Sequence, residues 1–272
     1  MWLDAVGTQH ERAPADARIV SLVPSITELL FDLGCGDRVV GRTGFCIHPR
    51  EQVRNVPKVG GTKDVRIVTV RALKPSHAIV NVDENTTEVV EKLRAFVPHV
   101  IVTHPNSAQD NAELFALLGG IFGAETVAAT LTQRLHNEIE ACGAIEWPVE
   151  SVLYLVWKNP WMTIAADTYI ARTLALVGWQ VLQPPGGWSG AARYPTLAEI
   201  GPALESVGRV LLSTEPYMFR QRDVDELRKQ SSRTVDLIDA EMTSWYGSRG
   251  VQGLAYLRQF RQERVAKPAI RS

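Results

Sequence analysis

Aromatic side chains gather in the loop segments of this sequence, where they are placed to contact a ligand. Seven of them lie in polar or glycine- and proline-rich stretches and not at regular core positions: Trp157, Trp161, Trp188, Trp245, Tyr194, Tyr217 and Tyr246. A single ring of this kind often seals the core beneath its own loop. As a group, the seven favour a stacking surface for a flat or macrocyclic ligand.

Charged residues stand beside these aromatic residues: Lys63, Glu84, Glu215, Glu241 and Arg249. A few polar groups in an apolar pocket orient a ligand, although each of these side chains alone equally suits a solvated surface or a local salt bridge. Cys46 and His48 form a C-x-H pair that could ligate a soft metal or place an imidazole as axial ligand to a bound metallomacrocycle. Because two residues do not make a metal site, we predict no resident metal ion and no required cofactor.

The motifs of common enzymes are incomplete. The segment Gly34–Val39 starts like a dinucleotide-binding GxGxxG but ends in valine, and Gly60–Lys63 (GGTK) lacks the order of a phosphate loop. Gly187–Ala191 (GWSGA) approaches a nucleophile elbow, but its last glycine is replaced by alanine. These failures favour binding over catalysis. The remaining enzymatic alternative uses Glu84, Glu215 or Glu241 as acid or base, because carboxylates that converge in a cleft leave no linear motif.

Strand and helix patterns alternate along the chain. Strands are predicted at Arg18–Val23, Val39–Val40, His77–Val82, His99–Thr103, Ser151–Val156, Trp179–Leu182, Val210–Ser213 and Val235–Ile238. Helices are predicted at Ile67–Leu73, Thr87–Phe96, Gln109–Leu118, Thr168–Val177 and Gly250–Arg264, and a longer one at Ala124–Cys142. Alternation of this kind predicts parallel sheets covered on both faces, with ligands held by the loops at the carboxyl ends of the strands.

The predicted fold class is therefore α/β, with two doubly wound lobes joined by a single long backbone helix and a ligand cleft between the lobes. We divide the chain into an N-terminal extension (1–17), an N-terminal α/β lobe (18–122), the connecting helix (123–147) and a C-terminal α/β lobe (148–272).

Composition excludes several partners. The 272-residue chain has a net charge of −1, 45% hydrophobic and 22% charged residues, so it lacks the basic field that drives nucleic-acid binding. No apolar run approaches the ~18 residues of a transmembrane helix. Its three cysteines are far apart, and residues 2–17 are too polar for a secretory signal, which predicts a cytoplasmic location. The alternative is a periplasmic protein from which a signal has been removed.

The loops and elements together resemble a known family. The matching stretches in the first half are RIVSLVPSITELLFDLG, VVGRTGFCIHP, VPKVGGTKD, ALKPSHAIV and ENTTEVVEKL. Those in the second half are LYLVWKNPWMTIAADTYIARTLALVGW, RYPTLAEI, LLSTEPYMFRQRDVDEL and LIDAEMTSWYGSRG. The chain resembles the helical-backbone (class III) substrate-binding proteins of ABC transporters, closest to the cobalamin (vitamin B12) receptor-like branch. This resemblance implies reversible ligand binding between two lobes with little hinge motion.

The resemblance places Phe45, the Gly60–Lys63 loop, Glu84 and Asn85 in one wall of the ligand site, and Trp157, Trp161, Tyr194, Trp245 and Arg249 in the other. Combined with the loop analysis, the predicted ligand-contacting residues are Phe45, His48, Lys63, Glu84, Asn85, Trp157, Trp161, Tyr169, Trp188, Tyr194, Glu215, Tyr217, Trp245, Tyr246 and Arg249.

The implied ligand is a corrinoid, cobalamin or another metal-bearing macrocycle, and the alternative is a ferric siderophore or haem, whose anionic groups Lys63 and Arg249 would neutralise. Transport-competent relatives carry an outer-surface glutamate on each lobe for docking to an ABC permease. Here these positions hold Val68 and Ile200, with Glu199 adjacent to the latter. This departure argues against a permease partner and leads to the hypothesis of an intracellular carrier.

Overall fold

The computed structural model describes residues 1–184 and 192–265 and divides the chain into two units. Unit 1 comprises Met1–Pro105, Gln109–Leu135 and Tyr246–Arg249. Unit 2 comprises Asn106–Ala108, His136–Trp245 and Gly250–Ser272. The helix α6 (Glu125–Gly143) begins in unit 1 and ends in unit 2, so the long helix predicted at this place is present.

The sheet of unit 1 is built from four parallel strands, in the order β4-β3-β5-β6: β3 (Ile19–Ser21), β4 (Val39–Arg42), β5 (His77–Asn81) and β6 (His99–Thr103). Every residue of β3 and β5 is buried. This continuous burial explains their apolar runs, since a parallel sheet is covered on both faces.

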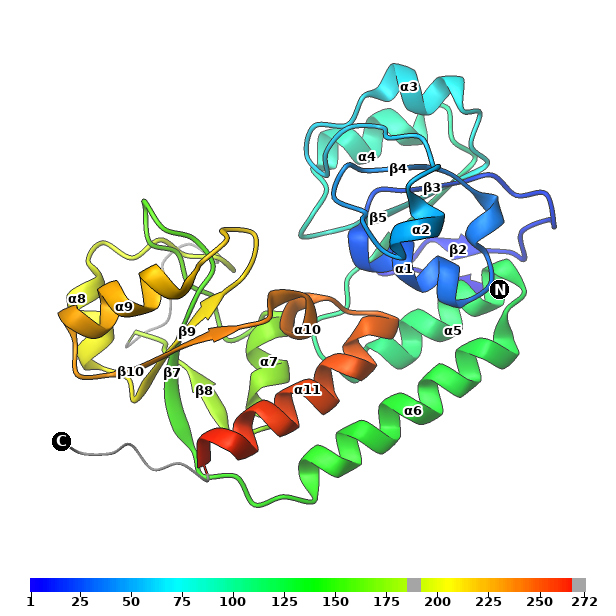
Figure 1. The fold of residues 1–272 in the computed structure, drawn as a ribbon. Helices are drawn as coiled ribbons and strands as arrows, with labels where there is room; N and C mark the ends of the chain where they lie inside the picture. The colour runs from blue at the N-terminus through cyan, green and yellow to red at the C-terminus, as the bar shows by residue number, and fades with distance from the viewer. Residues whose placement is uncertain (185–191, 266–272) are drawn as a thin grey trace. The chain divides into compact units, whose positions relative to one another are not determined.

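Helices cover both faces of this sheet (Figure 1): α1 (Pro24–Asp32), α2 (Arg50–Val53), α3 (Ile67–Ala72), α4 (Thr87–Arg94) and α5 (Asn111–Phe122). Alternate strand residues, such as Val20 and Leu22 of the β3 segment, share one apolar core with Val70 of α3 and Leu93 of α4. Their sequence neighbours point to the other face because side chains alternate along a strand. A 3-10 turn, η1 (Gly36–Arg38), leads into β4.

Residues 1–17, which the sequence predicts as an extension, are built into unit 1. They include an antiparallel hairpin of β1 (Trp2–Leu3) and β2 (Gln9–His10). The buried carboxylate of Asp4 accepts hydrogen bonds from the backbone N–H groups of Val6, Thr8 and Val102, at 3.1, 2.8 and 3.0 Å. The Val102 bond ties the hairpin directly to β6.

Unit 2 repeats the strand order of unit 1, with four parallel strands ordered β10-β9-β7-β8: β7 (Glu150–Leu155), β8 (Trp179–Val181), β9 (Arg209–Ser213) and β10 (Thr234–Ile238). In both sheets the first strand lies between the second and the third strand of its unit. The predicted fold class, two α/β lobes with parallel sheets, is confirmed by this topology. The predicted ligand cleft stays a prediction.

The helices of unit 2 also lie on both faces of its sheet (Figure 1): α7 (Tyr169–Ala175), α8 (Ile200–Glu205), α9 (Gln221–Gln230), α10 (Ala240–Ser244) and α11 (Ser248–Val265). The sequence patterns did not predict α8 and α9. Leu204 of α8 and Leu227 of α9 share one apolar core with Leu153 and Val210 of the sheet. In the described ranges, no helix has the length and apolarity needed to cross a membrane.

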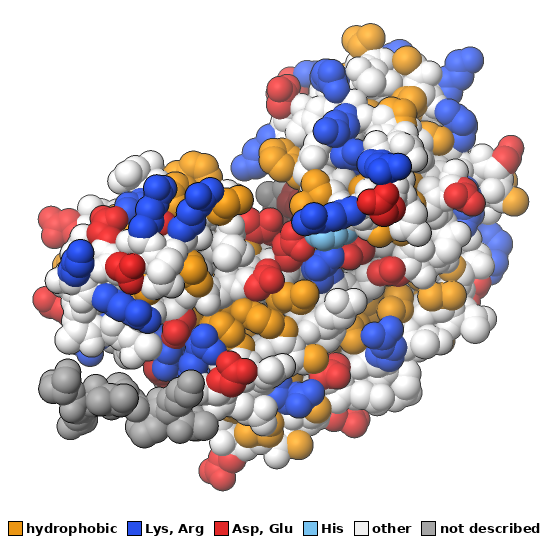
Figure 2. Space-filling view, viewed as in Figure 1, with side chains coloured by type: hydrophobic (Ala, Val, Ile, Leu, Met, Phe, Trp, Pro, Cys, Tyr) orange, Lys and Arg blue, Asp and Glu red, His pale blue; other side chains and the backbone are white. Residues whose placement is uncertain are grey.

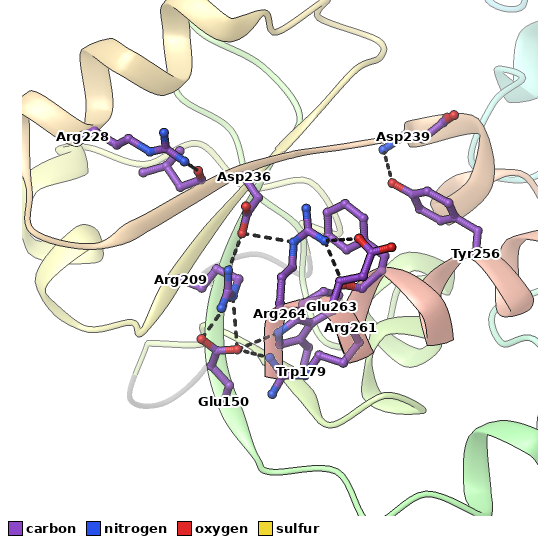
Figure 3. Close-up of polar contacts among 12 residues, drawn as sticks. Glu150, Trp179, Arg209, Arg228, Asp236, Asp239, Tyr256, Arg261, Glu263 and Arg264 are labelled. Atoms are coloured by element: carbon purple, nitrogen blue, oxygen red, sulfur yellow. Dashed lines mark hydrogen bonds and ion pairs between the residues drawn. The ribbon is translucent and has the colours of Figure 1, made fainter. Parts of the chain in front are cut away.

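A network of ion pairs closes the amino-terminal edge of this sheet (Figure 3). Glu150 accepts hydrogen bonds from the Trp179 indole (2.9 Å), from Arg209 Nε (3.2 Å) and from Arg261 of α11. Burial alone raises the pKa of Glu150, but the indole and the two guanidinium groups outweigh it and hold the pKa below its usual value. These residues are at the opposite end of the strands from the predicted ligand loops, so we assign the network a structural role.

Histidines from three strands gather in unit 1. The ring of His77, the first residue of β5, stacks on that of His99 at 4.6 Å and meets Phe122 edge-on at 5.5 Å, while its Nδ1 lies 2.9 Å from Ser76 Oγ. Burial, together with repulsion from His99, His10 and Arg38, lowers the pKa of His77 to about 4.

This lowered pKa predicts a loss of stability in mild acid. Between pH 6.5 and about 4 the unfolded chain binds a proton at this position and the folded chain does not. As the pH falls through this window, the free energy of unfolding should therefore decrease by about 3 kcal/mol. Above pH 6.5 the contribution of the uncharged His77 to stability is fully present. In urea unfolding, the decrease between pH 6.5 and about 4 should be larger in the wild type than in His77→Leu by about this amount, with exposed His136→Leu as control. Titration of folded His77 near pH 6.5 in an NMR experiment would contradict the prediction.

Candidate ligand-binding loops

The strand order locates the candidate site of each unit. In a doubly wound sheet, ligands bind at the carboxyl ends of the strands, where the strand order reverses. This point lies between β3 and β5 in unit 1 and between β7 and β9 in unit 2. The segments that follow these strands are Leu22–Val23 and Val82–Thr86 in unit 1, and Val156–Thr168 and Thr214–Arg220 in unit 2.

Exposed apolar side chains mark the loops that follow β4 and β5 in unit 1. Phe45 is 63% exposed, and Ile47 and Val82 are 42% and 47% exposed. A Cβ placed on Gly61 would lie 3.5 Å from the Phe45 ring, so the Gly60–Lys63 loop passes beside this ring. Lys63 is exposed, as a residue that contacts a ligand requires. The sequence analysis missed Ile47 and Val82, because single aliphatic residues in loops carry no distinctive pattern.

Asn85 holds three loops of unit 1 together. Its Oδ1 accepts the Asn81 N–H at 2.9 Å, and its Nδ2 donates to the Thr62 carbonyl at 2.8 Å and to that of Leu22 at 3.5 Å. The side chain is 7% exposed. The role of Asn85 in the structure is therefore to position the loops after β3 and β5 and the Gly60–Lys63 loop, and its predicted contact with a ligand stays a prediction.

The segment Tyr246–Arg249 belongs to unit 1, although the sequence around it belongs to unit 2. The Tyr246 hydroxyl donates to Glu84 at 2.6 Å, and the Gly247 N–H donates to Asn111 Oδ1 at 2.5 Å. Arg249 binds both carboxylate oxygens of Glu28, at 2.7 and 2.5 Å, and both side chains are largely buried. Two of the predicted ligand-orienting charges, Glu84 and Arg249, thus also hold this segment in place.

The C-x-H pair does not present its thiol to a ligand. Cys46 is fully buried, and its Sγ lies 3.1 Å from Thr43 Oγ1. Burial raises the pKa of this thiol, which disfavours the thiolate that a metal would need. His48 is half-buried. Within residues 1–184 and 192–265, no group of three or more His, Cys, Asp and Glu side chains is arranged to hold a metal ion.

A line of aromatic rings forms the candidate surface of unit 2. Trp157, 39% exposed, meets Tyr217 edge-on with ring centroids 5.6 Å apart. Tyr217 contacts the buried Phe219 at 4.7 Å, and Trp161 stacks on Phe219 at 6.1 Å. The structure therefore brings together three of the predicted residues, from loops separated by more than fifty positions. Met218, 63% exposed, is a further apolar residue of the loop that carries Tyr217, and the sequence analysis missed it.

The other predicted residues of unit 2 differ in their exposure. Tyr194 is 39% exposed, in a segment where Arg193 is paired with Asp167 at 3.2 Å. Tyr169, in the first turn of α7, is buried. The Trp245 indole donates to Glu215 at 2.6 Å. Trp188 lies outside the described residues, and Glu241 is half-buried in α10.

Figure 2 shows Lys/Arg and Asp/Glu side chains interspersed over the visible face of each unit. This mixture agrees with the net charge of −1 and with the exclusion of a basic field for nucleic acid.

The geometry of Asn85 generates a prediction about the folding of unit 1. Asn85→Asp keeps the size and the acceptor but replaces an amide donor that faces two carbonyl oxygens with a carboxylate. We expect a loss of about 1–3 kcal/mol in the free energy of unfolding, because two buried acceptors lose their donor. Urea unfolding measures it, and Asn55→Asp in an exposed position is the matched control. Equal stability of the two variants would contradict the loop-holding role.

Comparison with known proteins assigns the chain to a family. The model of the periplasmic binding protein family matches residues 19–190. The vitamin B12-binding protein of Photorhabdus laumondii is 26% identical over 194 residues, which cover 69% of this chain and 70% of that protein. An uncharacterized ABC transporter substrate-binding lipoprotein of Bacillus subtilis, YvrC, is 31% identical over 128 residues, or 45% of this chain and only 40% of that protein.

Two solved structures share the fold. The periplasmic vitamin B12 binding protein BtuF of Vibrio cholerae superposes with a TM-score of 0.75 at 18% identity, covering 92% of this chain and 98% of that one. The periplasmic heme-binding protein RhuT of Roseiflexus sp. RS-1, in apo form, gives 0.74 at 21% identity, covering 91% and 98%. The chain therefore belongs to the periplasmic binding protein family, and it is a substrate-binding protein of the ABC-transporter type and not an enzyme.

Proposed function

We propose that this protein reversibly binds a corrinoid of the cobalamin type through the loops at the carboxyl ends of its strands. The observation that carries the proposal is the aromatic surface of unit 2, where the exposed Trp157 is braced edge-on by Tyr217. Phe45 presents a second exposed ring in unit 1. Rings held in this way contribute large apolar contact area at low entropic cost, which suits a broad macrocycle.

Charge supports a corrinoid over a polyanionic ligand. Two cations are expected to neutralise haem or siderophore carboxylates: Lys63 is exposed, but Arg249 already makes two hydrogen bonds with Glu28. Arg193 is likewise paired with Asp167. A corrinoid whose side chains end in uncharged amides requires no such cation. The relatives named vitamin B12-binding proteins agree with this choice, whereas the fold alone does not separate the two ligands, because B12- and heme-binding proteins share it.

The comparisons do not support a cytoplasmic intracellular carrier, since the B. subtilis relative is described as a transporter lipoprotein. Val68, at one expected permease-docking position, is 83% exposed on α3, and Glu199 is exposed just before α8. The absence of a permease partner stays a prediction.

The ligand is tested by titration of tryptophan fluorescence. Cyanocobalamin and cobinamide should quench it saturably, with micromolar or tighter Kd, and be recovered unchanged, whereas haemin and a ferric hydroxamate siderophore should not. Trp157→Ala and Phe45→Ala should each weaken cobalamin binding about tenfold, measured by calorimetry, because each removes an aromatic anchor.

Phe96→Ala is the control variant. Phe96 follows the C-terminus of α4 and is covered by Arg71, 4.3 Å from its ring centroid, at the other edge of the sheet from the ligand loops. Its Kd for cobalamin should be unchanged. Saturable quenching by haemin alone, or by no corrinoid with the protein folded, would reject the proposed ligand.

A further inference from the structure

The loop that carries Trp157 is a short hairpin whose base is held by the backbone. The Val156 N–H donates to the Met162 carbonyl at 3.0 Å, and the Met162 N–H donates to the Trp157 carbonyl at 3.2 Å. Between these ends the chain turns through Asn159, which has a φ of 61°. The Trp161 carbonyl also accepts the Leu197 N–H at 2.9 Å. The tip of a turn beyond such bonds is free to move unless its side chains hold it.

Lys158 fastens this tip to α9. Its Nζ lies 2.7 Å from Glu226 Oε2 and 3.2 Å from Asp223 Oδ1, and the Lys158 side chain is only 15% exposed. The hydrogen bond that Lys158 donates to Glu226 raises the pKa of Lys158, so the ammonium group stays charged at neutral pH. The same Nζ lies 5.5 Å from the ring centroid of Trp161, within the range of a cation–π contact.

The partner carboxylate in α9 is itself fixed. Asp223 is 3% exposed in its side chain, and its Oδ2 accepts the Arg220 N–H at 2.9 Å at the start of α9. Val224 and Leu227 of the same helix are buried in the core of unit 2. Lys158 is therefore attached to a packed helix and not to another mobile loop.

Both tryptophans of the hairpin lie next to this attachment and pack on other aromatic rings. Trp157 precedes Lys158 and meets Tyr217, and Trp161 stacks on Phe219 with an interplanar angle of 3°. The two aromatic contacts and the Lys158 ion pairs hold the hairpin on three sides. A ligand surface that is ordered before binding does not lose that conformational entropy on association.

We propose that Lys158 is a positioning residue for ligand binding: its ion pairs with Asp223 and Glu226 hold the Trp157–Met162 hairpin so that Trp157 is presented to the ligand. The inference rests on the proposed function, because it assigns Trp157 to the ligand surface. It adds a residue that is predicted to touch no ligand atom.

The test uses Lys158→Met, which keeps the aliphatic stem and removes the charge. We expect cobalamin binding to weaken about fivefold by calorimetry, with Lys158→Arg within twofold of the wild type, because arginine preserves the ion pairs. Lys92→Met is the matched control, since Lys92 also pairs with a glutamate, Glu88, at 2.6 Å, but on exposed α4 of unit 1. Its Kd should not change. An unchanged Kd in Lys158→Met would overturn the proposal.

A double-mutant cycle separates positioning from general destabilisation. If Lys158 acts through Trp157, Lys158→Met should have no further effect on Kd in a Trp157→Ala background. Fully additive effects would mean that Lys158 acts by another route and would overturn the proposal.

A measurement without ligand keeps the inference independent of ligand identity. Nitrogen-15 relaxation of the Trp157 indole N–H should show greater nanosecond motion in Lys158→Met than in the wild type and in Lys92→Met. If no corrinoid binds the wild type, the proposed function fails, and this relaxation result still decides whether Lys158 orders the hairpin. If cobalamin binds but indole motion is unchanged, only the positioning role fails.

Discussion

Each unit depends on the parallel pairing of four strands, and the strand order is the same in both units. Parallel strands require crossover connections, so every strand of a unit sends its carboxyl end to the same edge of the sheet. The loops that carry Phe45 and Glu84 in unit 1, and Trp157 and Tyr217 in unit 2, all follow such ends. Residues that are distant in sequence thereby become neighbours without any local signal in the chain.

The charged residues of this protein serve structure more than the sequence suggests. Arg249 is paired with Glu28, Lys158 with Asp223 and Glu226, and Glu150 with two arginines at the opposite edge of the sheet of unit 2. A largely buried charge must be paired, because its desolvation is otherwise uncompensated. The ligand loops also expose apolar side chains, among them Phe45, Val82 and Trp157, which agrees with a ligand that presents broad surfaces and uncharged polar groups.

Binding by such a surface depends on rigidity as well as on contact area. Asn85 joins three loops of unit 1 through the Asn81 N–H and the carbonyl oxygens of Thr62 and Leu22. Tyr217 and Phe219 support the two tryptophans of the hairpin in unit 2. Each support comes from a residue that is itself buried or held by its neighbours. This arrangement is typical of sites in which the supporting residues keep the contacting side chains in one conformation before the ligand arrives.

The sequence by itself determined the order of elements, the two α/β units, the long helix and the membership in a family of binding proteins, because apolar periodicity and loop composition are local properties. It missed α8 and α9, whose few apolar residues, such as Leu204 and Leu227, give a weak helical period in short segments. Only the tertiary structure decided which loop residues are available. Cys46 and Asn85 proved to be buried, and Arg249 was paired with a glutamate more than two hundred positions away. Burial and ion pairing depend on what the fold brings near a residue, and no pattern along the chain encodes that proximity.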